Sequence, residues 1–458
     1  MTVTGQDGGQ EPWLDGEREW LAERLSALLS QLDEVDQHVW ISSVFDVMRE
    51  QMRLDGLEPQ DLEVVGRRYL VCRVPASRPA FAAGQRQALL ISACLEPDRP
   101  YSTETAAADP VEQRDHLIAR GGILAAFGVV MVAALRRWVD AGRFETARDL
   151  VLSIEVVSPQ HNGVHGTEQV DPEQGILRGC AVALADGGGH AMKVGDRSLV
   201  TVAVAQKAAV WLRLLARGDG AEPVLPEAEG ALGRLLGALE RISTWPLPWR
   251  ASASARAQVQ ATAASQGVGR ALVLRGLLNS ATYGQAIRRL GENERRSVHA
   301  LFHDTITLTQ VHGGSRPDSC PIEATATLDC RLVPGRTTTE LVAELRAVIG
   351  DAIEVEVLGE RRGVQSPCHA PMFGIIKEIV EQRESHRRVV PTMVAGSCDA
   401  LAWRQVAVPA FGFVPVQGDE QVDFGGLWQR GAVPFQQAAV QRGLETFAEV
   451  VVRFLVEG

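Results

Sequence analysis

The spacing of apolar residues divides the N-terminal half of the chain into helices and strands. Between residues 17 and 54, apolar residues recur every three or four positions, which predicts two amphipathic helices. Short apolar runs then alternate with a longer helical stretch. The predicted strands are residues 69–74, 88–94, 149–157 and 179–185, and the predicted helix is 123–139. Buried strands that alternate with helices are typical of a wound, largely parallel sheet.

A different pattern begins near residue 206. The predicted strands are residues 209–216, 305–311, 323–332 and 353–359, and the predicted helices are 227–242 and 338–349. Their order, β-α-β-β-α-β, is that of a split-βαβ sandwich. Residues 245–291 include an Ala/Ser/Gln-rich run, and we interpret them as an insertion of low complexity. The wound pattern returns after residue 363, with predicted helices 372–382 and 435–456 and predicted strands 389–393 and 410–413.

These elements predict an α/β fold of two parts. A wound, mostly parallel sheet with helices on both faces is interrupted by an α+β split-βαβ lid domain. Residues 1–206 and 363–458 would form a catalytic-type α/β domain, and residues 207–362 would form the lid. A length of 458 residues agrees with two domains, because single cores rarely grow to this size.

Composition narrows the classes of partner and compartment. With 46 basic and 57 acidic side chains, the net charge of −11 argues against nucleic acid as a partner. No uncharged apolar run reaches the roughly 18 residues that a membrane span needs, so no membrane association is expected. The N-terminus lacks a signal pattern, and the seven cysteines show no CxxC spacing. We therefore expect a cytoplasmic protein with reduced thiols.

Three segments carry a resemblance to a known family. They are KAAVWLRLLARG (207–218), CPIEATATLDCRLVPG (320–335) and AGSCDALAWRQVAVPAFGF (395–413). In this order and spacing they resemble the dinuclear zinc amidohydrolases, which include glutamate carboxypeptidase, aminoacylase, acetylornithine deacetylase and N-acyl amino acid synthase/hydrolase. The likeness runs from about residue 85 to the end of the chain. It implies the predicted fold, and it makes a homodimer through the lid a candidate.

The resemblance also implies where the family's zinc site would lie. The family uses five zinc ligands and a catalytic Glu, and two zinc ions share a bridging Asp. At the matching positions this chain has Cys94 for the first His, Leu124 for the bridging Asp and Gln160-His161 for the Glu pair. Asp186 keeps the acidic ligand. The C-terminal ligand motif matches residues 425–430 and the lid His motif matches residues 221–226, and neither segment contains a His.

These replacements change the expected chemistry. Leu124 has no lone pair to bridge two zinc ions, and the Gln160 side chain cannot accept a proton as the family's Glu does. We therefore expect no ordinary two-zinc mechanism, no bound metal and no cofactor.

Three polar residues at former ligand positions are the candidate catalytic residues: Cys94, His161 and Asp186. One hypothesis is a nucleophilic Cys94 thiolate with a histidine base and an orienting carboxylate. A second is a single relocated zinc held by the same residues, with His165, His190 or water as a fourth ligand. The alternative without function is a small buried cysteine and hydrogen-bonded loop histidines.

The candidate substrate-binding residues are Arg331, Cys398, Asp399, His165 and His190. The guanidinium of Arg331 suits a carboxylate, although a structural ion pair is an equal alternative. The glycines that follow Asp186 resemble a phosphate loop only weakly, because no Lys-Ser/Thr follows them.

The leading functional hypothesis is a fold that has lost its dinuclear zinc site and keeps a cleft for a small acyl or amino-acid-like ligand. Such a protein would perform metal-independent or altered chemistry at an amide, ester or thioester, or would bind the ligand without turnover. The competing hypotheses are a non-catalytic structural or interaction protein and a hydrolase that uses the single relocated zinc. The motivating observation is that ligand positions have changed while the lid and sheet segments are well formed.

Overall fold

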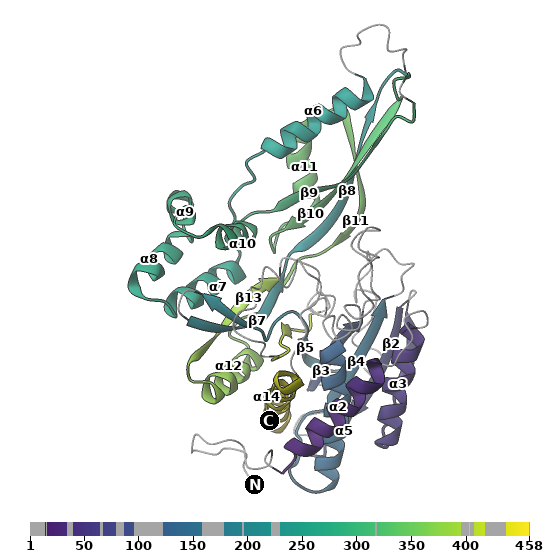
Figure 1. The fold of residues 1–458 in the computed structure, drawn as a ribbon, viewed down its shortest axis with the longest axis vertical. Coiled ribbons are helices and arrows are strands. Elements are labelled where there is room, and N and C mark those ends of the chain that lie inside the picture. Colours follow the sequence, from purple (N-terminus) through teal and green to yellow (C-terminus); the bar gives the residue numbers. More distant parts are fainter. Residues whose placement is uncertain are drawn as a thin grey trace.

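The chain folds into two β-sheets and their helices, as the computed structural model in Figure 1 shows. The structure describes residues 14, 16–33, 40–64, 67–78, 87–95, 122–157, 178–194, 197–220, 230–316, 318–394, 403, 407–416 and 437–457. The smaller sheet extends away from the larger one in Figure 1, and a group of helices lies beside the place where the two meet.

The larger sheet has ten strands in the order β1-β2-β4-β3-β5-β14-β7-β12, and β6 and β13 also pair with β7. Its strands are β1 (Gln60–Val64), β2 (Arg67–Val74), β3 (Ala88–Leu95), β4 (Leu150–Val157), β5 (Cys180–Ala185), β6 (Ala191–Val194), β7 (Arg197–Gln206), β12 (Val364–Gln365), β13 (Arg387–Val394) and β14 (Ala410–Gly412). The central strands β4, β3, β5 and β14 run parallel, while β1, β2 and β6 join antiparallel. A wound sheet with a parallel centre was predicted, and it is confirmed.

One large apolar core joins this sheet to five helices. They are α2 (Arg18–Asp33), α3 (Trp40–Leu54), α5 (Ile123–Asp140), α12 (Pro371–Arg383) and α14 (Gln437–Val456). Helix α5 is buried on nearly every side because it is apolar around its circumference. Gly128 lets it lie close to β4, since a Cβ there would come within 2.3 Å of Leu152 Cδ1.

The smaller sheet has the predicted split-βαβ arrangement. Its strands are β8 (Ala208–Arg217), β9 (Thr305–Gly313), β10 (Glu323–Leu332) and β11 (Ile353–Arg361), and its helices are α6 (Ala231–Thr244) and α11 (Thr338–Ile349). All neighbours in the order β11-β8-β10-β9 are antiparallel. Alternate residues of β10 are buried against the two helices, as a strand of period two requires.

The stretch interpreted as an insertion of low complexity, residues 245–291, is largely helical, and these helices were not predicted. It contains α7 (Ala253–Ala264), α8 (Val268–Gly276) and α9 (Ser280–Ile287), and α10 (Glu292–Phe302) follows it. Helix α7 packs against β13 of the larger sheet. Gln258 Oε1 accepts a hydrogen bond from the Met393 amide at 3.1 Å, and Gln365 Oε1 accepts one from the Ser254 amide at 3.0 Å. The insertion therefore covers a strand edge that would otherwise be open.

Strands β1, β6, β7 and β12 were not predicted. Strand β7 matters most, because it leads directly through Lys207 into β8 and so connects the two sheets. No helix in the described part of the chain is long and apolar enough to cross a bilayer.

Candidate functional site

The carboxyl ends of β4, β3 and β5 lie at one edge of the larger sheet, because the three strands are parallel neighbours. This edge holds two of the predicted catalytic residues. Cys94 is the last residue but one of β3, and Asp186 is the first residue after β5. Ligands of wound α/β sheets bind at such an edge, so the two residues lie where a site is expected.

Strand register adds two further polar residues to this edge. Glu155 of β4 is the partner of Cys94 in the parallel pair and of Tyr69 in the antiparallel pair with β2. Side chains of directly paired residues lie on the same face of a sheet. Tyr69, Glu155 and Cys94 therefore form a row across three strands, which we call the edge row. Their exposed fractions are 2%, 2% and 6%.

A tryptophan is hydrogen-bonded to the next row of residues on this face, which consists of Ser92 and Ser153. Ser92 and Ser153 are paired two residues before Cys94 and Glu155, and so lie on the same face. Trp403 Nε1 donates to Ser92 Oγ at 2.7 Å, and both residues are buried. Ser153 Oγ is buried and has no hydrogen-bond partner among the described residues. A polar group in that state is costly unless a ligand or water can reach it.

The glycines after Asp186 serve packing. A Cβ on Gly188 would lie 2.2 Å from the Gly412 carbonyl oxygen, and one on Gly189 would lie 2.2 Å from that of Val414. The run lets the chain pass close to β14, so the weak likeness to a phosphate loop has this structural explanation. His190 follows, and burial lowers its pKa to about 4. Its imidazole is therefore neutral at pH 7.

Four predicted site residues lie outside the described residues: His161, His165, Cys398 and Asp399. The proposed meeting of His161 with Cys94 and Asp186 remains a prediction. Sequence reasoning missed Glu155 and Tyr69. The signal for Glu155 was a single carboxylate inside the apolar strand LVLSIEVV, where burial of an acid needs a reason.

A pair of zinc ions at this edge would need a bridging anionic ligand. Leu124, at the position that the resemblance assigns to the bridging Asp, is the second residue of α5 and is fully buried in the apolar core. Its side chain has no donor atom. Within the described part of the chain, no group of three or more His, Cys, Asp or Glu side chains is placed to hold a metal ion. These residues do not fit a dinuclear site.

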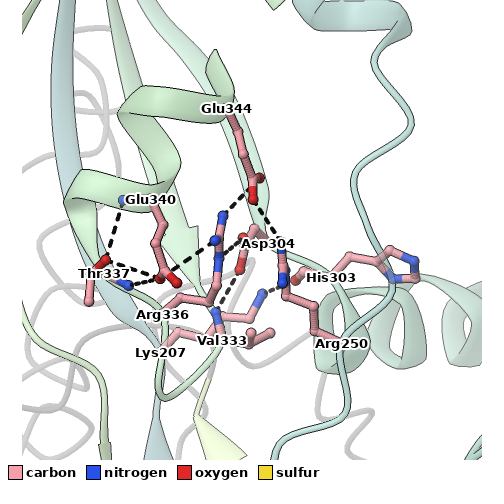
Figure 2. Close-up of polar contacts among 9 residues, drawn as sticks. All are labelled: Lys207, Arg250, His303, Asp304, Val333, Arg336, Thr337, Glu340 and Glu344. Carbon is pink, nitrogen blue, oxygen red and sulfur yellow. Dashed lines mark hydrogen bonds and ion pairs between the residues drawn. The ribbon is translucent and has the colours of Figure 1, made fainter. Parts of the chain in front are cut away.

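A second buried polar region lies where the two sheets meet, and Figure 2 shows it. Lys207 is 1% exposed, and its Nζ donates to the His303 carbonyl oxygen at 2.7 Å. Burial is the main cause that lowers the pKa of Lys207 to about 8. The Asp304 carboxylate opposes this shift, and the guanidinium of Arg331 adds to it.

The other charges of this region are paired. Asp304 accepts hydrogen bonds from the Val333 amide at 2.8 Å and from Arg336 Nε at 3.2 Å. Arg336 Nη2 also donates to Glu344 at 2.9 Å, and Arg250 donates to the same carboxylate at 2.8 Å. We call Lys207, Arg250, His303, Asp304, Arg336 and Glu344 the junction. The junction ties the start of β8, the end of α10 and the first turns of α11 together (Figure 2).

Arg331, a predicted substrate-binding residue, is held within the smaller sheet. Its Nε and Nη2 donate to the two carboxylate oxygens of Asp329 at 2.6 and 2.8 Å. The guanidinium lies 5.8 Å from the ring centroid of Trp211, whose Nε1 also donates to Asp329. Arg331 Nη1 is buried and has no hydrogen-bond partner among the described residues. The ion pair with Asp329 therefore uses Nε and Nη2 of Arg331, and Nη1 is left for another acceptor.

Sequence comparisons find one matching domain family and two related proteins. Residues 258–356 match the peptidase dimerisation domain of the M20 family. A probable carboxypeptidase S-like protein of Dictyostelium discoideum is 23% identical over 227 residues, which are 48% of this chain and 42% of that protein. A second such protein from the same organism is 23% identical over 127 residues, 27% of this chain and 26% of its own length. The chain thus matches less than half of each relative.

Solved structures match over nearly the whole chain. A M20 family metallo-carboxypeptidase from Sulfolobus solfataricus is 12% identical with a TM-score of 0.61, covering 94% of this chain and 99% of that one. The di-peptidase Dug1p from Saccharomyces cerevisiae (12%, TM-score 0.57, 96% and 97%) and human carnosine dipeptidase 1 (10%, TM-score 0.57, 97% and 97%) are similar. At these identities the likeness shows the fold.

Proposed function

We propose that this chain, which has the fold of the M20 peptidases, has lost the dinuclear zinc site and acts on a small acyl or amino-acid-like ligand. The larger sheet would supply the reacting groups at its carboxyl edge, without zinc. Residues 207–362 would form the lid, and residues 1–206 and 363–458 the catalytic-type domain. The chemistry would be acyl transfer or hydrolysis at an amide, ester or thioester, or binding of such a ligand without turnover.

The observation that carries this proposal is Leu124. The position that the family resemblance assigns to the bridging Asp is occupied by a side chain that belongs to the apolar core. At the same time Cys94, Glu155 and Asp186 keep polar groups at the sheet edge. A site whose metal ligands change while its edge stays polar supports altered chemistry more than decay of the whole protein.

The match to the peptidase dimerisation domain supports a homodimer through the lid. Strand β9 is the edge of the smaller sheet, and its residues from Thr307 to Gly313 are exposed. An exposed edge strand is a template for pairing with another chain. Leu308 and Val311 are about half exposed on it. We expect sedimentation velocity to show a dimer that Leu308→Lys with Val311→Lys converts to a monomer.

The proposed function is tested by adding N-acyl amino acids and dipeptides to the purified full-length protein. We expect no hydrolysis above background with added zinc or cobalt, because Leu124 and Gln160 stand at the positions that the resemblance assigns to the bridging ligand and the general base. We expect N-acyl amino acids to raise the melting temperature, since a ligand that binds the native state stabilises it.

Metal-dependent turnover of these substrates would overturn the proposal. The absence of any thermal shift across a panel of N-acyl amino acids, simple esters and thioesters would favour the interaction-protein hypothesis instead. Gln160→Ala serves as the control, because turnover that disappears in this variant would show that the family's base position still works.

A further inference from the structure

We propose that Glu155 is the proton acceptor for the thiol of Cys94, and that the two side chains form the reacting pair of a cysteine-dependent acyl transfer. The inference rests on the proposed function and deepens it, because it names the base for the acyl chemistry. It assigns that role to a strand residue in place of a loop histidine.

The strand register places the two groups together. Cys94 and Glu155 are direct partners in the parallel pair of β3 and β4. Paired residues have Cβ atoms about 5 Å apart on the same face, which is within reach of a thiol and a glutamate carboxyl. Tyr69 pairs with Glu155 from the other side. One carboxyl group therefore lies between a thiol and a phenol, and all three residues are buried.

The surroundings point to a ligand on this face. Ser153, two residues before Glu155, is 1% exposed and its hydroxyl has no hydrogen-bond partner in the described part of the chain. It lies on the same face as the edge row because side chains two apart on a strand share a face. Trp403, which donates to the neighbouring Ser92, belongs to a buried apolar cluster that includes Tyr69. The face is thus apolar at Trp403 and polar at the edge, as in many small-molecule sites.

The reaction balances with water as the second reactant. The thiol of Cys94 gives its proton to the carboxylate of Glu155, and the sulfur bonds to the acyl carbon. The bond from this carbon to the leaving amine, alcohol or thiol breaks, and the leaving group takes the proton from Glu155. Water then gives a proton to Glu155 and attacks the thioester. The carboxylic acid leaves, and the sulfur regains its proton from Glu155.

The test uses p-nitrophenyl acetate as an acetyl donor with the full-length protein. Acetylation is followed at each cysteine by peptide mass spectrometry, and release of p-nitrophenolate is followed by absorbance. We expect Cys94 to be acetylated. Cys72 serves as the internal reference, since it lies on the same sheet and burial raises its pKa to about 11. In Glu155→Gln we expect the acetylation rate of Cys94 to fall about a hundredfold, the usual effect of losing a general base.

Glu17→Gln is the matched control. Glu17 is also buried, and its carboxylate forms ion pairs with Arg137 and Arg143 at the far end of α5. An equal fall in this variant would mean that Glu155→Gln acts through the fold, and the inference would be wrong. If Glu155→Gln does not fold, Glu155→Asp replaces it. It keeps the carboxyl group, so its rate should fall less and keep the wild-type pH profile.

The outcomes separate the two proposals. Acetylation of Cys94 at the same rate in wild type and Glu155→Gln overturns the role of Glu155 and leaves acyl chemistry at Cys94 standing. Acetyl transfer at another residue, with Cys94 unmodified, overturns the reacting pair while esters remain substrates. Failure of both ester cleavage and ligand binding overturns the proposed function and this inference with it.

Discussion

The junction and the edge row both bury polar side chains, but they balance charge in different ways. At the junction, anions and cations alternate: Asp304 and Glu344 share Arg336, and the buried ammonium of Lys207 points to a carbonyl oxygen. The edge row contains a thiol, a carboxyl and a phenol from three neighbouring strands. The junction uses its charges to hold the start of β8, the end of α10 and α11 together, whereas the edge row brings together groups that can exchange protons.

This difference separates structural from chemical use of buried polar groups. A buried ion pair with several hydrogen bonds has one favourable arrangement, so it fixes geometry. Neighbouring groups that can each give up or accept a proton can serve proton transfer instead. Variants of the junction should therefore change stability, and variants of the edge row should change reactivity.

The largest expected effect is that of Asp304→Ala. The substitution leaves Arg336 buried without one of its anions and the Val333 amide without its acceptor. Breaking a buried pair from one side costs about 3 to 5 kcal/mol of unfolding free energy. Urea unfolding followed by circular dichroism measures this loss.

Asp318→Ala is the control, because Asp318 forms an ion pair with Arg316 whose two side chains are mostly exposed. Exposed pairs contribute about 0 to 1 kcal/mol, so this variant should unfold close to wild type. Equal losses in the two variants would contradict the assigned role of the junction.

The next effect is a pH dependence that Lys207 causes. Its pKa falls from 10.5 to about 8 on folding. Between these values the unfolded chain binds more protons than the folded chain, so wild-type stability rises with pH across this window. Below about pH 8 Lys207 is charged in the folded state, so the full free-energy cost of burying its ammonium is present. Relative to Lys207→Met, wild type should gain about 2 to 3 kcal/mol from pH 7 to pH 10.

Denaturant unfolding of the two proteins at both pH values measures that difference. The comparison cancels groups that titrate alike in both proteins. An unchanged difference would show that Lys207 keeps its ordinary pKa in the folded state, and that the junction tolerates its burial without electrostatic cost.

A smaller effect is expected beside the edge row. Ser92→Ala removes the acceptor of the Trp403 indole N–H, which is buried. A buried donor without a partner costs about 1 to 3 kcal/mol. Ser153→Ala is the matched control from the paired strand, because its hydroxyl has no partner among the described residues to lose. Ser153→Ala should therefore be neutral or stabilising, and thermal unfolding of both variants tests this contrast.

Much of the fold was predictable because most elements carry a clear apolar period. The strands and helices of the smaller sheet begin and end within a few residues of their predicted bounds. Helix α7 was missed because its buried face consists mainly of small residues such as Ser254, Ala255 and Ala263. Such a face lacks the contrast between apolar and polar positions on which periodicity depends. The helix forms although its periodicity is weak, because alanine has a high intrinsic helix propensity.

The candidate site was less predictable, because it depends on which strands are neighbours. Cys94 and Asp186 were found from the resemblance to a family. Glu155 enters only through the register of β3 with β4, and Tyr69 only through the pairing of β2 with β4. Sequence periodicity predicts a strand but not its neighbour or its register. The junction was missed for the same reason, since its residues come from four separate segments.

The smallest expected effect is that of a chelator. We expect protein purified without added zinc to contain well under one equivalent of metal by elemental analysis. We expect EDTA to leave its melting temperature unchanged, since a bound structural or catalytic zinc would add stability that the chelator removes.

The physical reason for expecting no effect of the chelator is Leu124 in α5. Two zinc ions repel each other at short range and need a bridging anion, and Leu124 supplies an apolar side chain from the core at that position. Two equivalents of zinc, together with a fall in melting temperature on chelation, would contradict the assignment of Leu124. One equivalent that disappears in Cys94→Ser would instead favour the relocated zinc and make Cys94 a ligand, so the proton exchange with Glu155 would no longer be its role.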